Sequence, residues 1–110
     1  MKVTKGGSNV FSDIGLDEIE AEELAVKADL VTLLLHAVRA RALTQTHAAR
    51  ICGVDQPTLS KILSGKLDSV TIDRLAKWIV ALGGKIQITV KQPKEKHGKY
   101  KGGISVAATP

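Results

Sequence analysis

The chain has 110 residues, a formal net charge of +5 and a pI near 9.5, and only 3% of its residues are aromatic. This length allows one small domain with tails, whose modest core a partner subunit would help to stabilise. One cysteine excludes an intrachain disulfide, and no apolar run approaches the roughly 18 residues of a membrane span. No signal-peptide pattern follows Met1 and the three histidines lack metal-ligand spacing, so we expect a cytoplasmic protein without metal or cofactor.

The charge is distributed unevenly along the chain. Residues 44–91 hold seven Lys and Arg against three Asp and Glu, whereas residues 10–43 hold three against seven. A basic surface favours a polyanionic partner such as nucleic acid. We therefore expect such a partner to meet residues 44–91.

Residues 1–9 are polar and basic, which predicts a disordered leader. The apolar pair Val10 and Phe11 follows, and Phe11 is the single phenylalanine. Two roles remain open for it, namely anchoring the leader on the domain or docking onto a partner protein.

The longest helical pattern extends from Leu16 to Ala42. Apolar steps of three and four predict a core stripe made of Leu24, Ala28, Val31, Leu35 and Val38, widened by Leu30, Leu33 and Leu34. An apolar surface of this width predicts that the helix packs against other parts of the protein on more than one side. The pattern also allows the helix to break into two near Lys27.

An acidic run opens this helical pattern, where negative charge suits the positive end of the helix dipole. Its members are Asp17, Glu18, Glu20, Glu22 and Glu23. They form either a solvated face or, together with Val10 and Phe11, a docking strip for a basic partner protein.

Residues 43–66 predict two short helices joined by a tight turn at Gly53. Glycine adopts the positive φ of such a turn without a Cβ penalty. Thr44 and Asp55 are suited to cap the two helices, and Pro57 falls in the first turn of the second, where a missing N–H matters least. This pattern is a helix-turn-helix.

In a helix-turn-helix, the first helix braces the second against base edges in a DNA major groove. A Gln56 amide can pair with adenine, Lys61 with guanine, and the Thr58 methyl can contact thymine. We expect base contacts from Gln56, Pro57, Thr58 and Lys61, and phosphate contacts from Thr44, Gln45, Thr46, Ser60 and Lys66. The alternative is two ordinary amphipathic helices with solvated polar faces.

A further helix is predicted from Thr71, as its cap, to Gly83, with Ile72, Leu75, Ile79 and Leu82 facing inward. Trp78 lies off this stripe, which predicts a place at the core edge or in a subunit contact. Residues 85–91 then alternate with a period of two and predict a strand with one apolar face, formed by Ile86, Ile88 and Val90.

A single strand needs a partner for its backbone, which could be the leader, a second copy of the chain or another protein. Pairing about a two-fold axis is the most economical of these, so we expect a homodimer. Residues 92–110 predict a flexible tail whose four lysines could attract phosphates.

The helix-turn-helix stretch resembles the Xre family, the lambda repressor and Cro-like regulators. The residues that carry the resemblance are Leu43, Thr44, Gln45, Ala48, Ala49, Gly53, Gln56, Pro57, Ser60, Gly65 and Lys66. It implies a mainly α, four- or five-helix lambda-repressor-like DNA-binding domain over residues 10–91, between the leader and the tail, with a C-terminal β-strand used in dimerisation.

Within that family, residues 9–91 are similar to the HigA-like antitoxins of toxin–antitoxin pairs. The similar segments are Asn9–Phe11, Asp13–Leu16, Ala21–Glu23 with Lys27 and Ala28, Gln56 and Pro57, Gly65–Leu67, Asp73–Leu75, and Leu82–Gly84. The resemblance implies a protein that binds operator DNA, represses its own operon and neutralises a RelE or HigB-like, RNA-cleaving toxin.

Other functions remain open beside that of an antitoxin. A free-standing Xre-type repressor without a toxin partner fits residues 43–91 equally well, and weak binding to duplex DNA at low salt would favour a DNA-independent adaptor. An enzyme is disfavoured, because the sequence offers no set of residues typical of a catalytic site.

Overall fold

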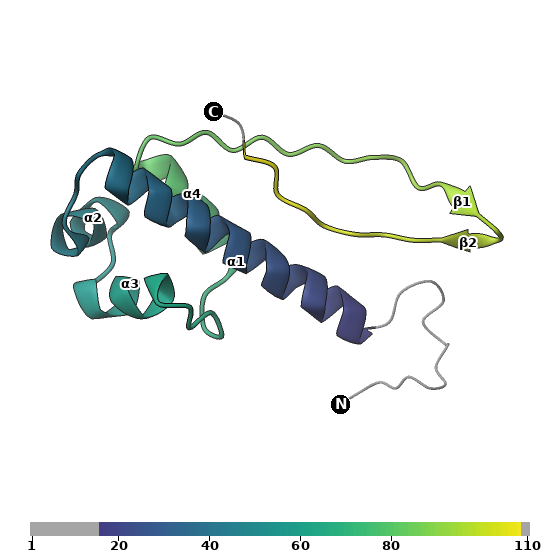
Figure 1. Cartoon of the computed structure of the whole chain (residues 1–110), viewed down its shortest axis with the longest axis horizontal. Helices are drawn as coiled ribbons and strands as arrows, with labels where there is room; N and C mark the ends of the chain where they lie inside the picture. The colour runs from purple at the N-terminus through teal and green to yellow at the C-terminus, as the bar shows by residue number, and fades with distance from the viewer. Residues whose placement is uncertain (1–15, 109–110) are drawn as a thin grey trace.

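The computed structural model of the chain describes residues 16–108, which form four helices and a small two-stranded sheet (Figure 1). In chain order these are α1 (Leu16–Ala40), α2 (Gln45–Cys52), α3 (Gln56–Leu63), α4 (Ile72–Ala81), β1 (Glu95–Lys96) and β2 (Lys99–Tyr100). The prediction of a mainly α fold is confirmed. The leader and the pair Val10 and Phe11 lie outside the described residues.

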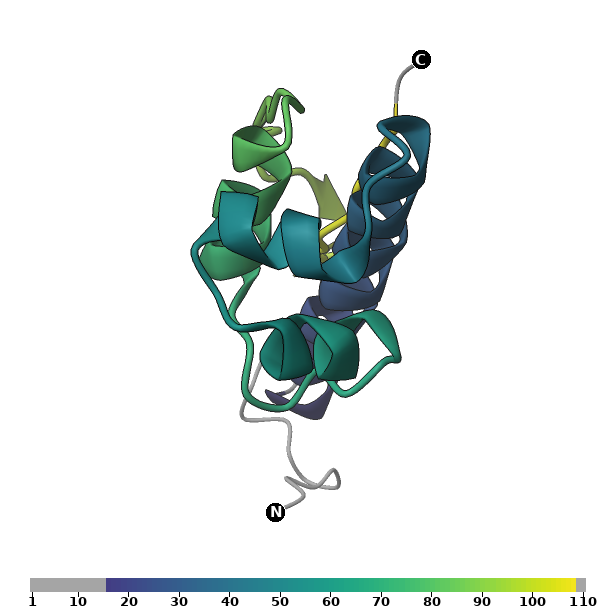
Figure 2. The same cartoon turned by 90° about the vertical axis from the view of Figure 1, so that its left-hand side faces the viewer.

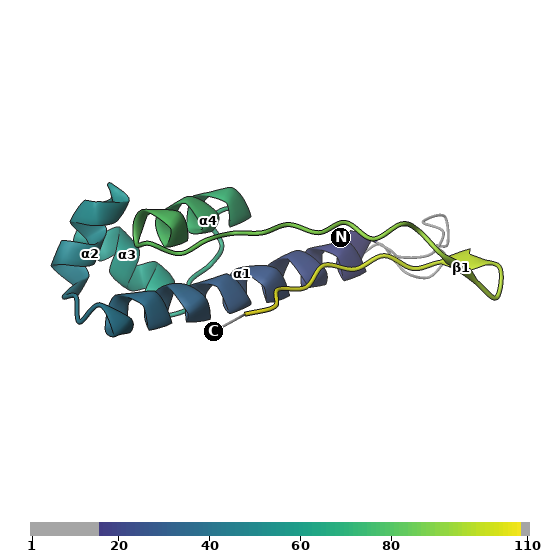
Figure 3. The ribbon, with the colours of Figure 1, turned by 90° about the horizontal axis from the view of Figure 1, so that it is seen from above.

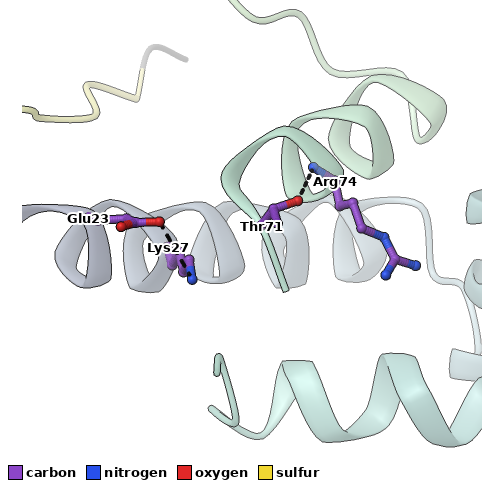
Figure 4. Close-up of polar contacts among 4 residues, drawn as sticks. All are labelled: Glu23, Lys27, Thr71 and Arg74. Carbon is purple, nitrogen blue, oxygen red and sulfur yellow. Dashed lines mark hydrogen bonds and ion pairs between the residues drawn. The ribbon is translucent and has the colours of Figure 1, made fainter. Parts of the chain in front are cut away.

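Helix α1 is continuous, so the break that the sequence allows near Lys27 does not occur. The Lys27 ammonium lies 3.9 Å from the Glu23 carboxylate, one turn earlier in the same helix (Figure 4). The helix begins well beyond the other three, and its first turns have no helix packed over them (Figures 1 and 3).

The buried stripe of α1 differs from the predicted one. Leu24 is 54% exposed and Ala28 is also exposed, because both face away from α3 and α4. The buried residues of α1 are Val26, Leu30, Val31, Leu34 and Val38. Periodicity predicted all of these except Val26, and it wrongly added Leu24 and Ala28 to the buried face.

The core lies between α1 and α4 and is closed at one end by α2 and α3 (Figure 2). Its fully buried large side chains are Leu34, Leu59, Val70 and Leu75. Trp78 is only 5% exposed and therefore belongs to this core rather than to its edge. The Arg74 guanidinium covers its ring at 5.2 Å from the centroid. Cys52 is half-buried beside α4, and burial raises the pKa of its thiol.

All four helices end in the same way, with one residue in the left-handed region and two backbone hydrogen bonds back to the last turn. That residue is Gly53 after α2, Gly65 after α3 and Gly83 after α4, with φ of 74°, 103° and 103°. After α1 it is Ala42, with φ of 54°. There the Leu43 N–H donates to the Val38 carbonyl at 3.0 Å, and the Ala42 N–H to the Arg39 carbonyl at 2.9 Å.

Residues 85–108 form a C-terminal arm, which consists of an outgoing limb (85–94), the β1–β2 hairpin and a return limb (101–108). Both limbs run beside α1, and the hairpin projects past the start of that helix (Figures 1 and 3). The Ile104 N–H donates to Glu22 Oε1 at 2.7 Å. Ile86 and Val106 pack against the core at the base of the arm.

The predicted strand at residues 85–91 is extended but belongs to no ladder in the described chain, and the two strands found lie further along. Ile86 is half-buried, whereas Ile88 is 82% and Val90 84% exposed. Of the predicted apolar face, only Ile86 packs against the core. A strand also needs a hydrogen-bonding partner, and residues 16–108 place none beside residues 85–91.

We expect Ala42→Gly to raise the free energy of unfolding by about 0.5–1 kcal/mol, because it relieves a left-handed alanine at only a modest entropic cost. Ala25→Gly is the matched control. Ala25 is exposed inside α1, where glycine should lower stability by roughly the same amount. Urea unfolding followed by circular dichroism measures both, and a destabilised Ala42→Gly protein would contradict the expectation.

Candidate nucleic-acid interface

The interface is built around the turn between α2 and α3. Gly53 supplies the positive φ of the turn, and the Val54 N–H donates to the Ala49 carbonyl at 3.0 Å. No atom lies within 4 Å of a Cβ built on Gly53, so backbone conformation and not crowding requires glycine there. The predicted turn is confirmed.

Side chains at the start of each helix fix its first turn. Thr44 Oγ1 accepts the His47 N–H at 3.1 Å at the start of α2, and Asp55 Oδ1 accepts the Thr58 N–H at 2.8 Å at the start of α3. Hydrogen bonds from Thr58, first from its side chain and then from its backbone, lower the pKa of the Asp55 carboxyl. The carboxylate is therefore charged at neutral pH, as a cap at a helix N-terminus should be.

The two helices are held together by small and branched apolar side chains. Ala48 and Ala49 of α2 are buried, as are Leu59 and Ile62 of α3. Alanines leave room for the helices to approach closely, and the leucine and isoleucine connect α3 to the core. The buried face of α3 fixes the orientation of its opposite, polar face.

One hydrogen bond joins the starts of the two helices on that polar side. Gln56 Nε2, on the first residue of α3, donates to Gln45 Oε1, on the first residue of α2, at 3.1 Å. An amide group has two N–H donors and one carbonyl acceptor. Gln56 therefore retains one donor and its acceptor, which are the groups that a bidentate contact with adenine uses.

The residues expected to contact DNA lie on α2 and α3, at the N-cap of α2 or just after α3. Pro57 and Lys61 are exposed, whereas Gln56, Thr58 and Ser60 are half-buried. Thr44, Gln45, Thr46 and Lys66 are exposed around the two helix ends. The structure brings Gln45 and Gln56 together, and Lys66 returns to the end of α3, where its N–H donates to the Lys61 carbonyl at 3.1 Å.

The sequence alone did not reveal three contacts of the helical domain, one of which joins the two helices of the interface. They are the Gln45–Gln56 bond, the Arg74–Trp78 stacking and the bond from Arg41 Nη1 to the Leu82 carbonyl at 3.2 Å, which ties the ends of α1 and α4. The only available signal was the presence of glutamine at the first position of both helices. Helix α4 is capped as predicted, with Thr71 Oγ1 accepting the Arg74 N–H at 3.3 Å (Figure 4).

The acidic run expected to meet a protein partner lies at the free start of α1. Glu18, Glu20 and Glu23 are exposed, whereas Asp17 and Glu22 are half-buried. Glu22 already accepts the Ile104 N–H of the C-terminal arm. This run is therefore not a bare helix face, because part of it holds the return limb.

Residues 16–108 contain no group of three or more His, Cys, Asp and Glu side chains that could hold a metal ion. None of the described helices combines the length and the apolarity needed to cross a membrane.

Two short helices with a glycine turn, the second braced by the first and presenting a polar face, define the class of helix-turn-helix DNA-binding regulators. A family model described as "Helix-turn-helix domain" matches residues 10–91, and the chain belongs to this family. The family and the fold are those of DNA-binding transcriptional regulators rather than of enzymes.

Two relatives refine this placement. The chain is 25% identical over 92 residues to the "Putative antitoxin HigA2" of Mycobacterium tuberculosis (strain ATCC 25618 / H37Rv), a match covering 83% of this chain and 91% of that protein. A solved structure named "Putative XRE Family Transcriptional Regulator" has a TM-score of 0.71 and 29% identity, covering 82% of this chain and all but 1% of that one. The chain is thus an Xre-family protein close to HigA-like antitoxins.

We expect Gln56→Ala to weaken binding to the cognate operator by about 1–3 kcal/mol and to relax preference at one base pair. Gln45→Ala should relax preference at the same base pair, because it frees the Gln56 amide to rotate. In a double-mutant cycle the two effects should be less than additive. Titration against operators with single base-pair changes measures both quantities.

Lys66→Ala is the control for these variants, because the loss of a phosphate contact should weaken all sequences alike. Additive effects of the two glutamine substitutions, or unchanged base preference in the Gln56→Ala protein, would contradict the assignment.

Proposed function

We propose that this protein is the antitoxin of a toxin–antitoxin pair, which represses its own operon and neutralises a RelE or HigB-like toxin. The observation that carries the proposal is a helix-turn-helix with a pre-arranged Gln45–Gln56 pair in a chain aligned with nearly the whole of a relative named as an antitoxin. The mechanism has a DNA-binding part and a protein-binding part.

In the DNA-binding part, the start of α3 enters the major groove. Gln56, Pro57, Thr58 and Lys61 contact base edges, and the residues around them hold phosphates and fix the register, namely Thr44, Gln45, Thr46, Ser60 and Lys66. The short α3 does not have to order itself on binding, because Asp55 and the buried Leu59 already fix it. That pre-organisation reduces the entropic cost of association.

The protein-binding part uses the first turns of α1, which extend beyond the other helices (Figure 1). We call residues 17–24 the α1 overhang. It combines the acidic run with two exposed apolar side chains, Ile19 (43%) and Leu24 (54%). An enzyme that cleaves RNA is expected to carry a basic surface, which is complementary to this overhang in charge, with apolar anchors at its centre. Val10 and Phe11, which lie outside the described residues, belong to the same proposed toxin-binding segment.

Dimerisation is the third element of the proposal. In a dimer, the exposed apolar side chains of Ile88 and Val90 would be buried against a second copy of the chain. The backbone N–H and C=O groups of the outgoing limb would form a ladder of hydrogen bonds with the same limb of that copy. A two-fold axis perpendicular to this limb gives antiparallel pairing, and two α3 helices about 34 Å apart would fit successive major grooves. Free-standing repression remains the alternative, because it requires the DNA-binding part alone.

The test is co-expression with the neighbouring toxin-like gene, with growth as the readout. We expect wild type and Gln56→Ala to restore growth, because Gln56 lies far from the overhang. The triple variant Ile19→Ala/Glu20→Lys/Leu24→Ala should fail, because it removes the anchors and reverses one charge. Asp29→Lys, an equal charge reversal at an exposed site further along α1, is the matched control. If the toxin still arrests growth in the presence of folded wild-type protein, the protein does not neutralise it, and the function of a free-standing repressor would remain.

We expect Ile88→Asp/Val90→Asp to sediment as a monomer where wild type sediments as a dimer. The two side chains are exposed in the single chain, so the helical core should keep its circular dichroism and melting temperature. Gln87→Asp/Thr89→Asp adds the same charge to the other face of the limb and should leave the dimer intact. A dimeric Ile88→Asp/Val90→Asp protein would place the interface elsewhere.

A further inference from the structure

The hairpin of the C-terminal arm has a defined geometry. Its two strands pair antiparallel, with Lys96 opposite Lys99 and Glu95 opposite Tyr100. His97 and Gly98 form the two-residue turn, with φ of 55° and 76°. Positive φ at both central residues is the mark of a type I′ turn, whose twist matches that of the flanking strands.

This register sorts the side chains of the hairpin by charge. Residues opposite each other share a face, and successive residues alternate between faces. Lys96 and Lys99 therefore lie on one face, and Glu95 and Tyr100 on the other. Lys94 and Lys101, one step further along the extended chain, return to the first face. We call Lys94, Lys96, Lys99 and Lys101 the lysine face.

The lysine face is unfavourable for the hairpin itself. Like charges directly opposite each other destabilise a pair of strands. All four lysines are exposed, and none forms an ion pair within residues 16–108, in contrast to Lys27, which pairs with Glu23. Neither the core nor the α2–α3 interface contacts them. Such a cluster becomes favourable when an anionic partner neutralises it.

The composition of the two faces indicates the kind of anion. Proteins that bind single-stranded nucleic acid combine basic side chains with aromatic rings on which bases stack. Here Tyr100 lies on the opposite face from the lysines. A flat group of four point charges without an aromatic ring is suited to a phosphate backbone rather than to unstacked bases.

We propose that the lysine face is a second DNA contact, which binds phosphates of the duplex outside the site that α3 occupies. The hairpin lies beyond residues 10–91, the part matched by the family. It is at the opposite end of the molecule from α2 and α3, along a longest extent of 50 Å (Figures 1 and 3). If the molecule lay along the duplex, this extent would span about 15 base pairs at 3.4 Å each, so we place the lysine-face contact on duplex outside the base pairs that α3 reads.

Tethering makes such a weak contact effective. Once α3 is bound to the operator, the hairpin is held at a high local concentration near flanking phosphates. The second contact then loses little additional translational and rotational entropy. The contact carries no base preference, because phosphates are the same in every sequence. The proposal rests on DNA binding by the helix-turn-helix and adds a requirement for duplex beyond the operator.

The test compares the salt dependence of binding on two duplexes, one ending at the operator and one with about 20 extra base pairs on each side. Each phosphate contact contributes about 0.9 to the slope of log K against log salt. We expect Lys96→Gln/Lys99→Gln to lower that slope by about 1.8 per protein chain, or about 3.6 for the proposed dimer, on the long duplex and to leave it unchanged on the short one.

The matched control is Lys85→Gln/Lys91→Gln, which removes two lysines of the same arm that lie off the lysine face by alternation. It should keep the wild-type slope on both duplexes. Equal slopes for the two double variants on the long duplex would overturn the proposal. Two other results would also overturn the proposal. One is that the protein binds single-stranded RNA more tightly than duplex DNA and that Lys96→Gln/Lys99→Gln abolishes the RNA binding. The other is that this variant changes its oligomeric state without a change in slope.

This test also separates the second contact from the proposed function. If the helix-turn-helix did not recognise an operator, no sequence preference would be seen on either duplex. The slope difference between the two double variants would still be measurable on a long duplex of any sequence, and its presence or absence would decide the proposal.

Discussion

The orientation of α3 depends on one shared core. Leu34 of α1, Leu59 of α3 and Leu75 of α4 are fully buried in it. Burial of a leucine side chain contributes about 1.5–3 kcal/mol, against a total stability of about 5–15 kcal/mol for a domain. Helix α3 has eight residues, fewer than the roughly 12–15 that an isolated helix needs in water. Its polar face therefore exists only because its apolar face is buried.

The features predicted correctly from the sequence are those decided within a few residues. Thr44, Asp55 and Thr71 each accept a backbone N–H three residues ahead, and Gly53 adopts a positive φ. These outcomes depend on local geometry, which the order of residue types determines almost completely. The elements of the candidate interface could for that reason be placed before any tertiary contact was known.

The features that were missed depend on which segments meet in space. Leu24 has the apolar character of a core residue but lies where no other described helix reaches. The strand expected at residues 85–91 has no neighbouring strand within the described part of the chain. The Gln45–Gln56 bond joins residues eleven positions apart whose helices must first pack together. Hydrophobic periodicity describes one element at a time and cannot specify these pairings.

The bond between Glu22 and Ile104 joins residues 82 positions apart and has a consequence for the order of folding. Among residues 16–108 every buried core residue lies between Val26 and Leu82, so the helical core can close without the bond from Ile104. The arm is then the last part to settle, onto a surface that is already complete. It is also the part whose amide protons should exchange first with solvent, while those of the four helices stay protected.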